Sequence, residues 1–247
     1  MPRQAMPIDL EICVSSVESA IAAWAGGAKR VELCSALSEG GIAPSAGLID
    51  AVRAAVAMDV FVIIRPRGGD FAYSDREFDV MRRDIIEAKT RGVNGVVLGI
   101  LTVDGAVDVP RTKELIDLAR PLEVTFHRAF DLCKDLDRAL EAVVDCGAAR
   151  ILTSGGEADA LHGAGRIAQL RERAGDRIAI MAGGRIRSWN ARELALRTGI
   201  REVHSSLNNG ASSPGADLHP RDNGRVEFCV LEADVRAFKA VLDSIAL

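Results

Sequence analysis

The chain has 247 residues, of which 48% are hydrophobic and 27% charged, with a formal net charge of −4 at pH 7. This composition is typical of a globular protein with a sizeable core and excludes a disordered chain. The charge balance lacks the basic surplus of nucleic-acid-binding proteins, and the apolar runs are far shorter than the ~20 residues that cross a membrane. We therefore expect neither nucleic acid nor a membrane as a partner.

The N-terminus and the cysteines indicate a cytoplasmic protein. The stretch MPRQAMPIDLEIC has no long apolar core and no small-residue cleavage site, so no signal peptide is predicted. The 5 cysteines are odd in number and lack the close spacing of a disulfide framework or of a CxxC zinc motif.

Eight short apolar runs along the chain have the length and β-branched content of strands: IDLEICV, RVELC, VFVII, GVVLGIL, LEVTF, RILT, RIAIM and REVHS. Each is followed by an amphipathic stretch with a helical period, at residues 17–24, 48–57, 77–89, 112–119, 136–145, 159–173, 190–198 and 233–245. Ser15 and Ser74 each stand three residues before a glutamate, as the first residue of a capping box does.

Strict alternation of strands and helices predicts a parallel sheet. Eight such units in 247 residues favour a single-domain (β/α)8 TIM barrel over a doubly wound sheet, and no linker divides residues 1–247. One long irregular segment, at about residues 205–225, follows the eighth strand. We expect this segment to be either a functional or a mobile loop at the barrel mouth.

Two predicted strands carry the same unusual pair of polar residues. LEICV places Glu11 and Cys13 on one face, and RVELC places Glu32 and Cys34 on one face. In a TIM barrel the apolar face packs against helices, so we expect the polar face to point into the lumen or its mouth, where active sites lie. Neighbouring strands lie about 4.8 Å apart, so the two thiols could lie close together.

This thiol pair suggests a Cu(I) site at Cys13 and Cys34, because soft thiolates suit Cu(I) better than Mg²⁺ or Ca²⁺. The alternative is that each cysteine is a small buried hydrophobe, which is a common role for a free cysteine. We interpret Cys133, Cys146 and Cys229 in that way.

Polar residues at the other strand ends support a second hypothesis, an enzyme acting on a small anionic or phosphorylated metabolite. The candidate catalytic residues are His127, Glu11, Glu32, Glu202 and His204. The candidate anion-binding residues are Arg65, Arg67, Arg128, Thr153, Ser154, Gly155, Gly183 and Gly184. Guanidinium groups match carboxylates and phosphates, a histidine titrates near neutrality, and glycine-rich loops can turn backbone N–H groups toward an anion. Alternatively, acids and arginines such as Glu32 and Arg65 simply neutralise each other inside the barrel.

Six blocks of the sequence resemble the CutC family of copper homeostasis proteins: EICVSSVESA, RVELCSALSEGG, IRPRGGDFAYSDREF, VTFHRAFD, RILTSG and EVHSS. The resemblance runs from Glu11 to Ser206 and implies a cytoplasmic TIM barrel that forms a homo-oligomer (dimer or tetramer) and handles copper. In eukaryotic relatives Cu(I) is attributed to two cysteines in motifs that match EICV and ELCS, which implies Cys13 and Cys34 here. Ala72 stands where bacterial relatives often have cysteine, which removes one soft ligand. We therefore expect a Cu(I)-binding copper homeostasis protein, with the enzyme as the alternative.

Overall fold

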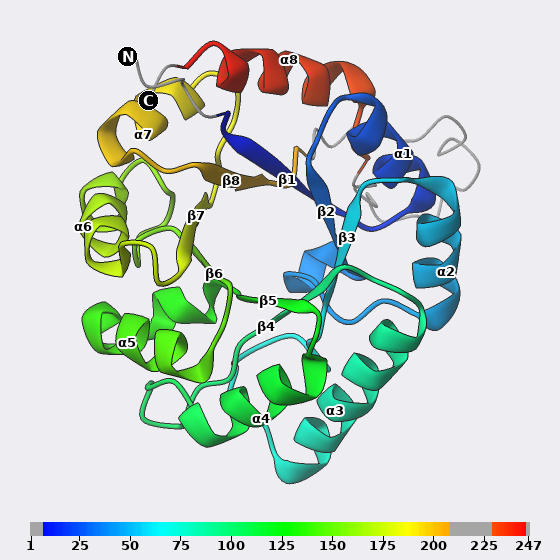
Figure 1. Cartoon of the computed structure of the whole chain (residues 1–247), viewed down its shortest axis with the longest axis vertical. Helices are drawn as coiled ribbons and strands as arrows, with labels where there is room; N and C mark the ends of the chain where they lie inside the picture. Colours follow the sequence, from blue (N-terminus) through cyan, green and yellow to red (C-terminus); the bar gives the residue numbers. More distant parts are fainter. Residues whose placement is uncertain (1–6, 208–228, 246–247) are drawn as a thin grey trace, which may run out of the picture.

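The structure, a computed structural model, describes residues 7–207 and 229–245. Its parallel strands pair in the order β1 to β8, and β8 pairs with β1, which closes a barrel (Figure 1). The helices form a ring around this barrel (Figure 1). The predicted (β/α)8 TIM barrel is therefore confirmed, whereas the loop predicted at about 205–225 lies outside the described residues from 208 onward.

The strands are β1 (Asp9–Val14), β2 (Arg30–Leu33), β3 (Asp59–Ile63), β4 (Gly95–Leu98), β5 (Glu123–Phe126), β6 (Arg150–Thr153), β7 (Ala179–Gly183) and β8 (Glu202–Ser205). The α-helices are α1 (Val17–Ala25), α2 (Ala46–Ala55), α3 (Asp75–Thr90), α4 (Val109–Ala119), α5 (Leu136–Cys146), α6 (Ala164–Ala174), α7 (Ala191–Thr198) and α8 (Glu232–Asp243). Two short 3-10 helices, η1 (Leu37–Glu39) and η2 (Arg128–Leu132), follow β2 and β5. Every predicted strand and helix is present, and among the described helices none is long and apolar enough to cross a membrane.

The helix starts show which capping predictions hold. At α3 the Ser74 hydroxyl accepts from the Glu77 N–H, and the Glu77 carboxylate accepts from the Ser74 N–H at 2.7 Å, which completes the predicted capping box. The capping box predicted at Ser15 is wrong. Because the chain still bends at residues 15–16 after β1, Ser16 is the N-cap of α1 and its hydroxyl accepts from the Ser19 N–H at 3.1 Å.

Strand alternation sorts the side chains into an outer and an inner set. The outer set, such as Leu10 and Ile12 of β1, is fully buried in the main apolar core. The inner set is largely polar. Arg30 of β2 reaches Glu202 of β8 and Met181 of β7, which requires its side chain to cross the barrel interior. The barrel interior therefore holds charged groups that have to satisfy one another.

Candidate functional site

The two thiols at the ends of β1 and β2 lie side by side. Cys13 Sγ is 3.5 Å from Cys34 Sγ, and the two residues expose 6% and 0% of their surfaces. Two metal–sulfur bonds of about 2.3 Å span at most ~4.6 Å, so both sulfurs could reach one metal ion. The contact with Cys34 and burial raise the pKa of the Cys13 thiol well above its ordinary value. A metal ion would therefore have to displace a proton from Cys13.

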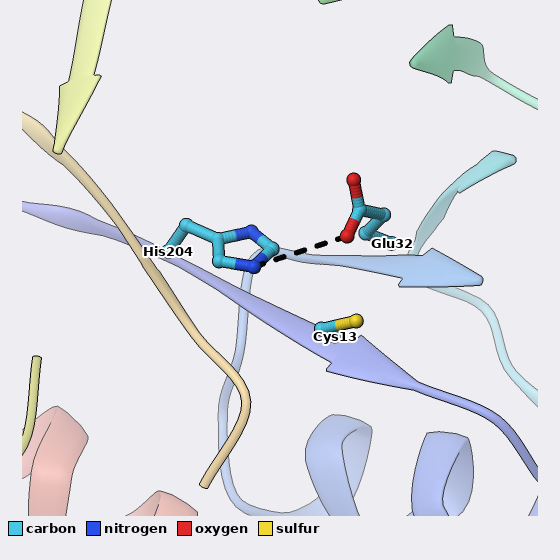
Figure 2. Close-up of side chains that lie close together, drawn as sticks. All are labelled: Cys13, Glu32 and His204. Carbon is cyan, nitrogen blue, oxygen red and sulfur yellow. Dashed lines mark ion pairs between the residues drawn. The ribbon is translucent and has the colours of Figure 1, made fainter. Parts of the chain in front are cut away.

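Glu32 and His204 form a cluster with Cys13 (Figure 2). One ligand atom from each of these three residues, on β1, β2 and β8, lies within 4.8 Å of the others. His204 Nε2 is 3.8 Å from Glu32 Oε2, whereas its Nδ1 is 2.7 Å from Glu11 Oε1. A carboxylate on one ring nitrogen orients an imidazole and leaves the other nitrogen for a metal. Glu11 therefore positions His204, whose Nε2 faces Glu32.

Burial and neighbouring charges set the protonation of this cluster. Burial by itself raises the pKa of Glu11, but Arg30 and His204 outweigh it and lower that pKa to about 2. Burial raises the pKa of Glu32, and His204 offsets only part of this rise. Burial by itself lowers the pKa of His204, but Glu32 and Glu11 outweigh it and raise that pKa. Glu11 is thus anionic, and His204 holds a proton more readily than a free imidazole does.

Two arginines that the sequence analysis did not single out neutralise the interior carboxylates. Arg30 Nε donates to Glu11 Oε2 at 2.5 Å, and Arg30 Nη2 donates to Glu202 Oε2 at 2.5 Å. Arg150 Nε donates to the same Glu202 oxygen at 2.5 Å. Both guanidinium groups also lie over the Phe61 ring, 5.3 and 5.5 Å from its centroid. The sequence signal was the alternation itself, since Arg30 stands two residues before Glu32.

Arg65 takes no part in this network and does not pair with Glu32. Its Nη1 donates to the carbonyls of Glu39 and Gly41 at 2.8 and 2.9 Å, and its Nη2 donates to the carbonyl of Gly69 at 2.9 Å. Arg65 thereby joins the loop after β2 to the loop after β3. Arg65 does not reach Glu32 because its guanidinium is bonded to these carbonyls at the barrel mouth.

The other two candidate anion-binding arginines are already paired with carboxylates. Arg67 Nε donates to Glu77 Oε1 at 2.6 Å, and Arg67 Nη2 donates to Asp70 Oδ1 at 2.9 Å. Arg128 Nε donates to Asp131 Oδ2 at 2.8 Å. An external anion would have to compete with these carboxylates for either guanidinium group.

The Asp131 carboxylate accepts hydrogen bonds from the end of β6 and from the loop that follows it. Its Oδ1 accepts from the Thr153 hydroxyl at 2.5 Å, from the Ser154 N–H at 3.0 Å and from the Gly156 N–H at 3.1 Å. The Gly155 N–H donates to Thr153 Oγ1 at 2.8 Å. A carboxylate of the same chain thus accepts the donors of this loop, and the binding of an external anion there stays a prediction.

Gly183 and Gly184 allow the end of β7 to approach β6. A Cβ at Gly183 would lie 2.5 Å from Leu152 Cδ1, and one at Gly184 would lie 3.2 Å from Ser154 Cβ. Gly184 also has a φ of +112°, which side chains rarely adopt. Close packing therefore accounts for both glycines, and their role in anion binding stays a prediction.

His127 stands apart from the cluster of Cys13, Glu32 and His204. It follows β5, which is four strands from β1 in either direction around the barrel. Its Nδ1 accepts from the Ala129 N–H at 3.2 Å, so Nε2 carries the ring proton, and Nε2 has no partner among the described residues. Burial, together with the smaller effect of the Arg65 charge, lowers the pKa of His127 to about 3. The imidazole is therefore neutral at physiological pH.

The sequence matches the model of the CutC family over residues 8–209. The chain belongs to the CutC family. A CutC protein from Chromobacterium violaceum is 49% identical over 204 residues, which cover 83% of each chain. The human copper homeostasis protein cutC homolog is 48% identical over 204 residues, covering 83% of this chain and 75% of the human protein. A solved CutC structure from Streptococcus agalactiae has a TM-score of 0.77 and 32% identity, over 81% of this chain and 98% of that one. The family resemblance of the sequence blocks is confirmed.

Proposed function

We propose that this CutC protein binds Cu(I) through Cys13 and Cys34 and takes part in copper homeostasis in the cytoplasm. The observation that carries the proposal is the 3.5 Å separation of two buried thiols at the ends of adjacent strands. Thiolates are the protein ligands that favour Cu(I), and the name of the human relative includes copper homeostasis. All five cysteines are free, which suits a reducing compartment.

Copper is the cargo in this proposal, and the residues beside the thiols serve its uptake. Binding requires the Cys13 thiol to lose its proton, because a thiolate and not a thiol is the metal ligand. Glu32 and His204 both lie next to Cys13 and are able to accept protons. The burial of both sulfurs excludes the water and oxidants that would reach an exposed Cu(I)–thiolate group.

An anaerobic competition titration of Cu(I) against a chromophoric chelator tests this function. We expect one tight equivalent in the unaltered protein. The Cys13→Ser/Cys34→Ser variant should bind at least ~100-fold more weakly, since loss of direct ligands should exceed the 10–100-fold effect of outer-shell changes. Cys133→Ser/Cys146→Ser is the matched control, because those thiols are also buried but contact Ala129 and Val109 instead. Equal affinity of the two double variants would contradict the proposal.

The Cys13–Glu32–His204 set favours a second candidate function, an enzyme that uses a zinc ion. Zinc accepts cysteine, histidine and glutamate ligands, and three protein ligands leave a coordination position open for water or substrate. The Glu11 carboxylate on His204 Nδ1 matches the usual outer shell of a zinc-bound histidine. Glu32 supplies a harder oxygen ligand, which Cu(I) does not require. This candidate differs from the enzyme hypothesis of the sequence analysis, which named a small anionic metabolite as substrate and no zinc ion.

Glu32→Gln separates the two metals. The change keeps the size of the side chain but removes a charged oxygen ligand, so we expect Zn²⁺ affinity to fall by about 10–100-fold or more. Cu(I) affinity should stay within about 3-fold, because sulfur ligands dominate Cu(I) binding. Chelator competition with each metal measures both constants. An absence of Zn²⁺ binding by the unaltered protein would eliminate the zinc enzyme, and an equal loss for both metals would contradict a copper site made of thiols alone.

A further inference from the structure

Three buried polar atoms at the ends of β3 and β5 lack hydrogen-bond partners. Within the described part of the chain, Arg65 Nε, Tyr73 Oη and His127 Nε2 are buried and form no hydrogen bond. The three residues expose only 5%, 6% and 5% of their surfaces. A buried donor without an acceptor is rare and costs free energy. Apart from the Tyr73 hydroxyl oxygen, the described residues therefore provide no acceptor for these donors.

Phe71 contacts two of these three side chains. The Phe71 ring centroid lies 4.8 Å from the His127 ring centroid and 4.9 Å from Arg65 Cζ. Burial raises the pKa of Tyr73, and the charge and hydrogen bonding of the Arg65 guanidinium partly oppose this rise. Phe71 is only half-buried, so its ring forms a thin cover between this region and solvent.

Gly99 explains how His127 comes close to Arg65. The register pairs Ile63 with Val97 and Val97 with Thr125 across β3, β4 and β5. Two residues further along each strand come Arg65, Gly99 and His127. A Cβ at Gly99 would lie 2.6 Å from the His127 ring, so only glycine lets the ring lie over β4, the strand that separates His127 from Arg65.

The chemistry of the three atoms selects an anion. Arg65 Nε is always a donor, and His127 Nε2 is a donor because Nδ1 accepts from Ala129. The Tyr73 hydroxyl can donate as well. The remaining hydrogen bonds of Arg65 go to backbone carbonyls, and it forms no ion pair with another described residue. The region thus combines three unpartnered polar atoms with a guanidinium that has no carboxylate partner among the described residues.

We infer that Arg65, Tyr73 and His127 bind the carboxylate of a small organic anion, at a site that includes neither thiol and is covered by Phe71. A carboxylate has one negative charge to match Arg65 and two oxygens to accept from the three donors. A phosphate dianion would leave a second negative charge without a partner in a buried place. The half-buried Phe71 ring provides an apolar contact for the carbon skeleton of the ligand and has to move for the ligand to enter.

Isothermal titration of the full chain with acetate, pyruvate and inorganic phosphate tests this site. We expect saturable binding of at least one carboxylate and weaker binding of phosphate. Tyr73→Phe and His127→Asn should each weaken carboxylate binding by about 10-fold, the loss expected for one hydrogen bond to a charged group. Asn at position 127 still offers an acceptor to the Ala129 N–H, and thermal unfolding of each variant shows whether it is folded.

Two controls make the outcome specific. Thr112→Val removes another buried, unpartnered hydroxyl, on α4, and should leave carboxylate binding unchanged. Cys13→Ser/Cys34→Ser should also keep carboxylate binding, so that failure of the copper proposal and failure of this site are distinguishable. The inference is overturned if neither carboxylate binds saturably in the millimolar range, or if all variants bind equally. Either result would leave ordered water as the partner of the three atoms.

Discussion

Arg30→Met is expected to lower the free energy of unfolding by about 3–5 kcal/mol, the usual cost of removing one partner from a buried ion pair. The Arg30 side chain is 6% exposed and bonds both Glu11 and Glu202. Methionine fills similar space without the charge. Of the side-chain partners described here, Glu11 would then still bond His204, and Glu202 would still bond Arg150. Urea unfolding followed by circular dichroism measures the change.

A surface pair provides the control for this network. Arg197 and Glu193 form an ion pair at 3.1 Å on α7, with side chains that are 48% and 59% exposed. Arg197→Met should therefore change the free energy of unfolding by less than about 0.5 kcal/mol. If Arg30→Met lowered the free energy of unfolding as little as Arg197→Met, the stability of the protein would not depend on the ion pairs of Arg30.

Acidification from pH 6.5 to pH 4 is expected to destabilise the protein through His127 by up to about 3 kcal/mol. The pKa of His127 falls from 6.5 to about 3 on folding. Below pH 6.5 the unfolded chain binds a proton at this imidazole that the folded protein does not bind until about pH 3. The unfolded state therefore binds more protons in this window, and stability rises with pH. The contribution is fully present above pH 6.5 and is lost as the pH falls toward 3.

His127→Asn should remove this contribution and flatten the pH dependence of stability. Urea unfolding at intervals from pH 7.5 to pH 4 measures the slope for each protein. His162→Asn is the comparison for loss of a histidine at the surface, since the His162 side chain is 78% exposed. Parallel profiles for the unaltered protein and His127→Asn would mean that the buried imidazole accepts its proton as readily as an unfolded one.

The sequence by itself determined the barrel and the two faces of its strands. Alternation with a period of two residues is a local property, and it places Glu11 and Cys13 together on β1 and Glu32 and Cys34 together on β2. The same pattern places Arg30, the first residue of β2, on the inner face of that strand. The strand–helix order then predicts the barrel, because each local unit has one way to pack.

Only the tertiary structure decided which inner residues meet. Glu11 bonds His204, which stands 193 residues later, because β8 closes the barrel against β1 with Glu11 opposite His204. A shift of either strand by two residues would preserve the alternation but separate these groups. The strand register, rather than residue type, decides that Arg30 and Arg150 pair with the interior carboxylates. The same register leaves Arg65 at the barrel mouth, where it bonds backbone carbonyls. Partner choice inside a barrel depends on strand register, and the sequence pattern does not encode that register.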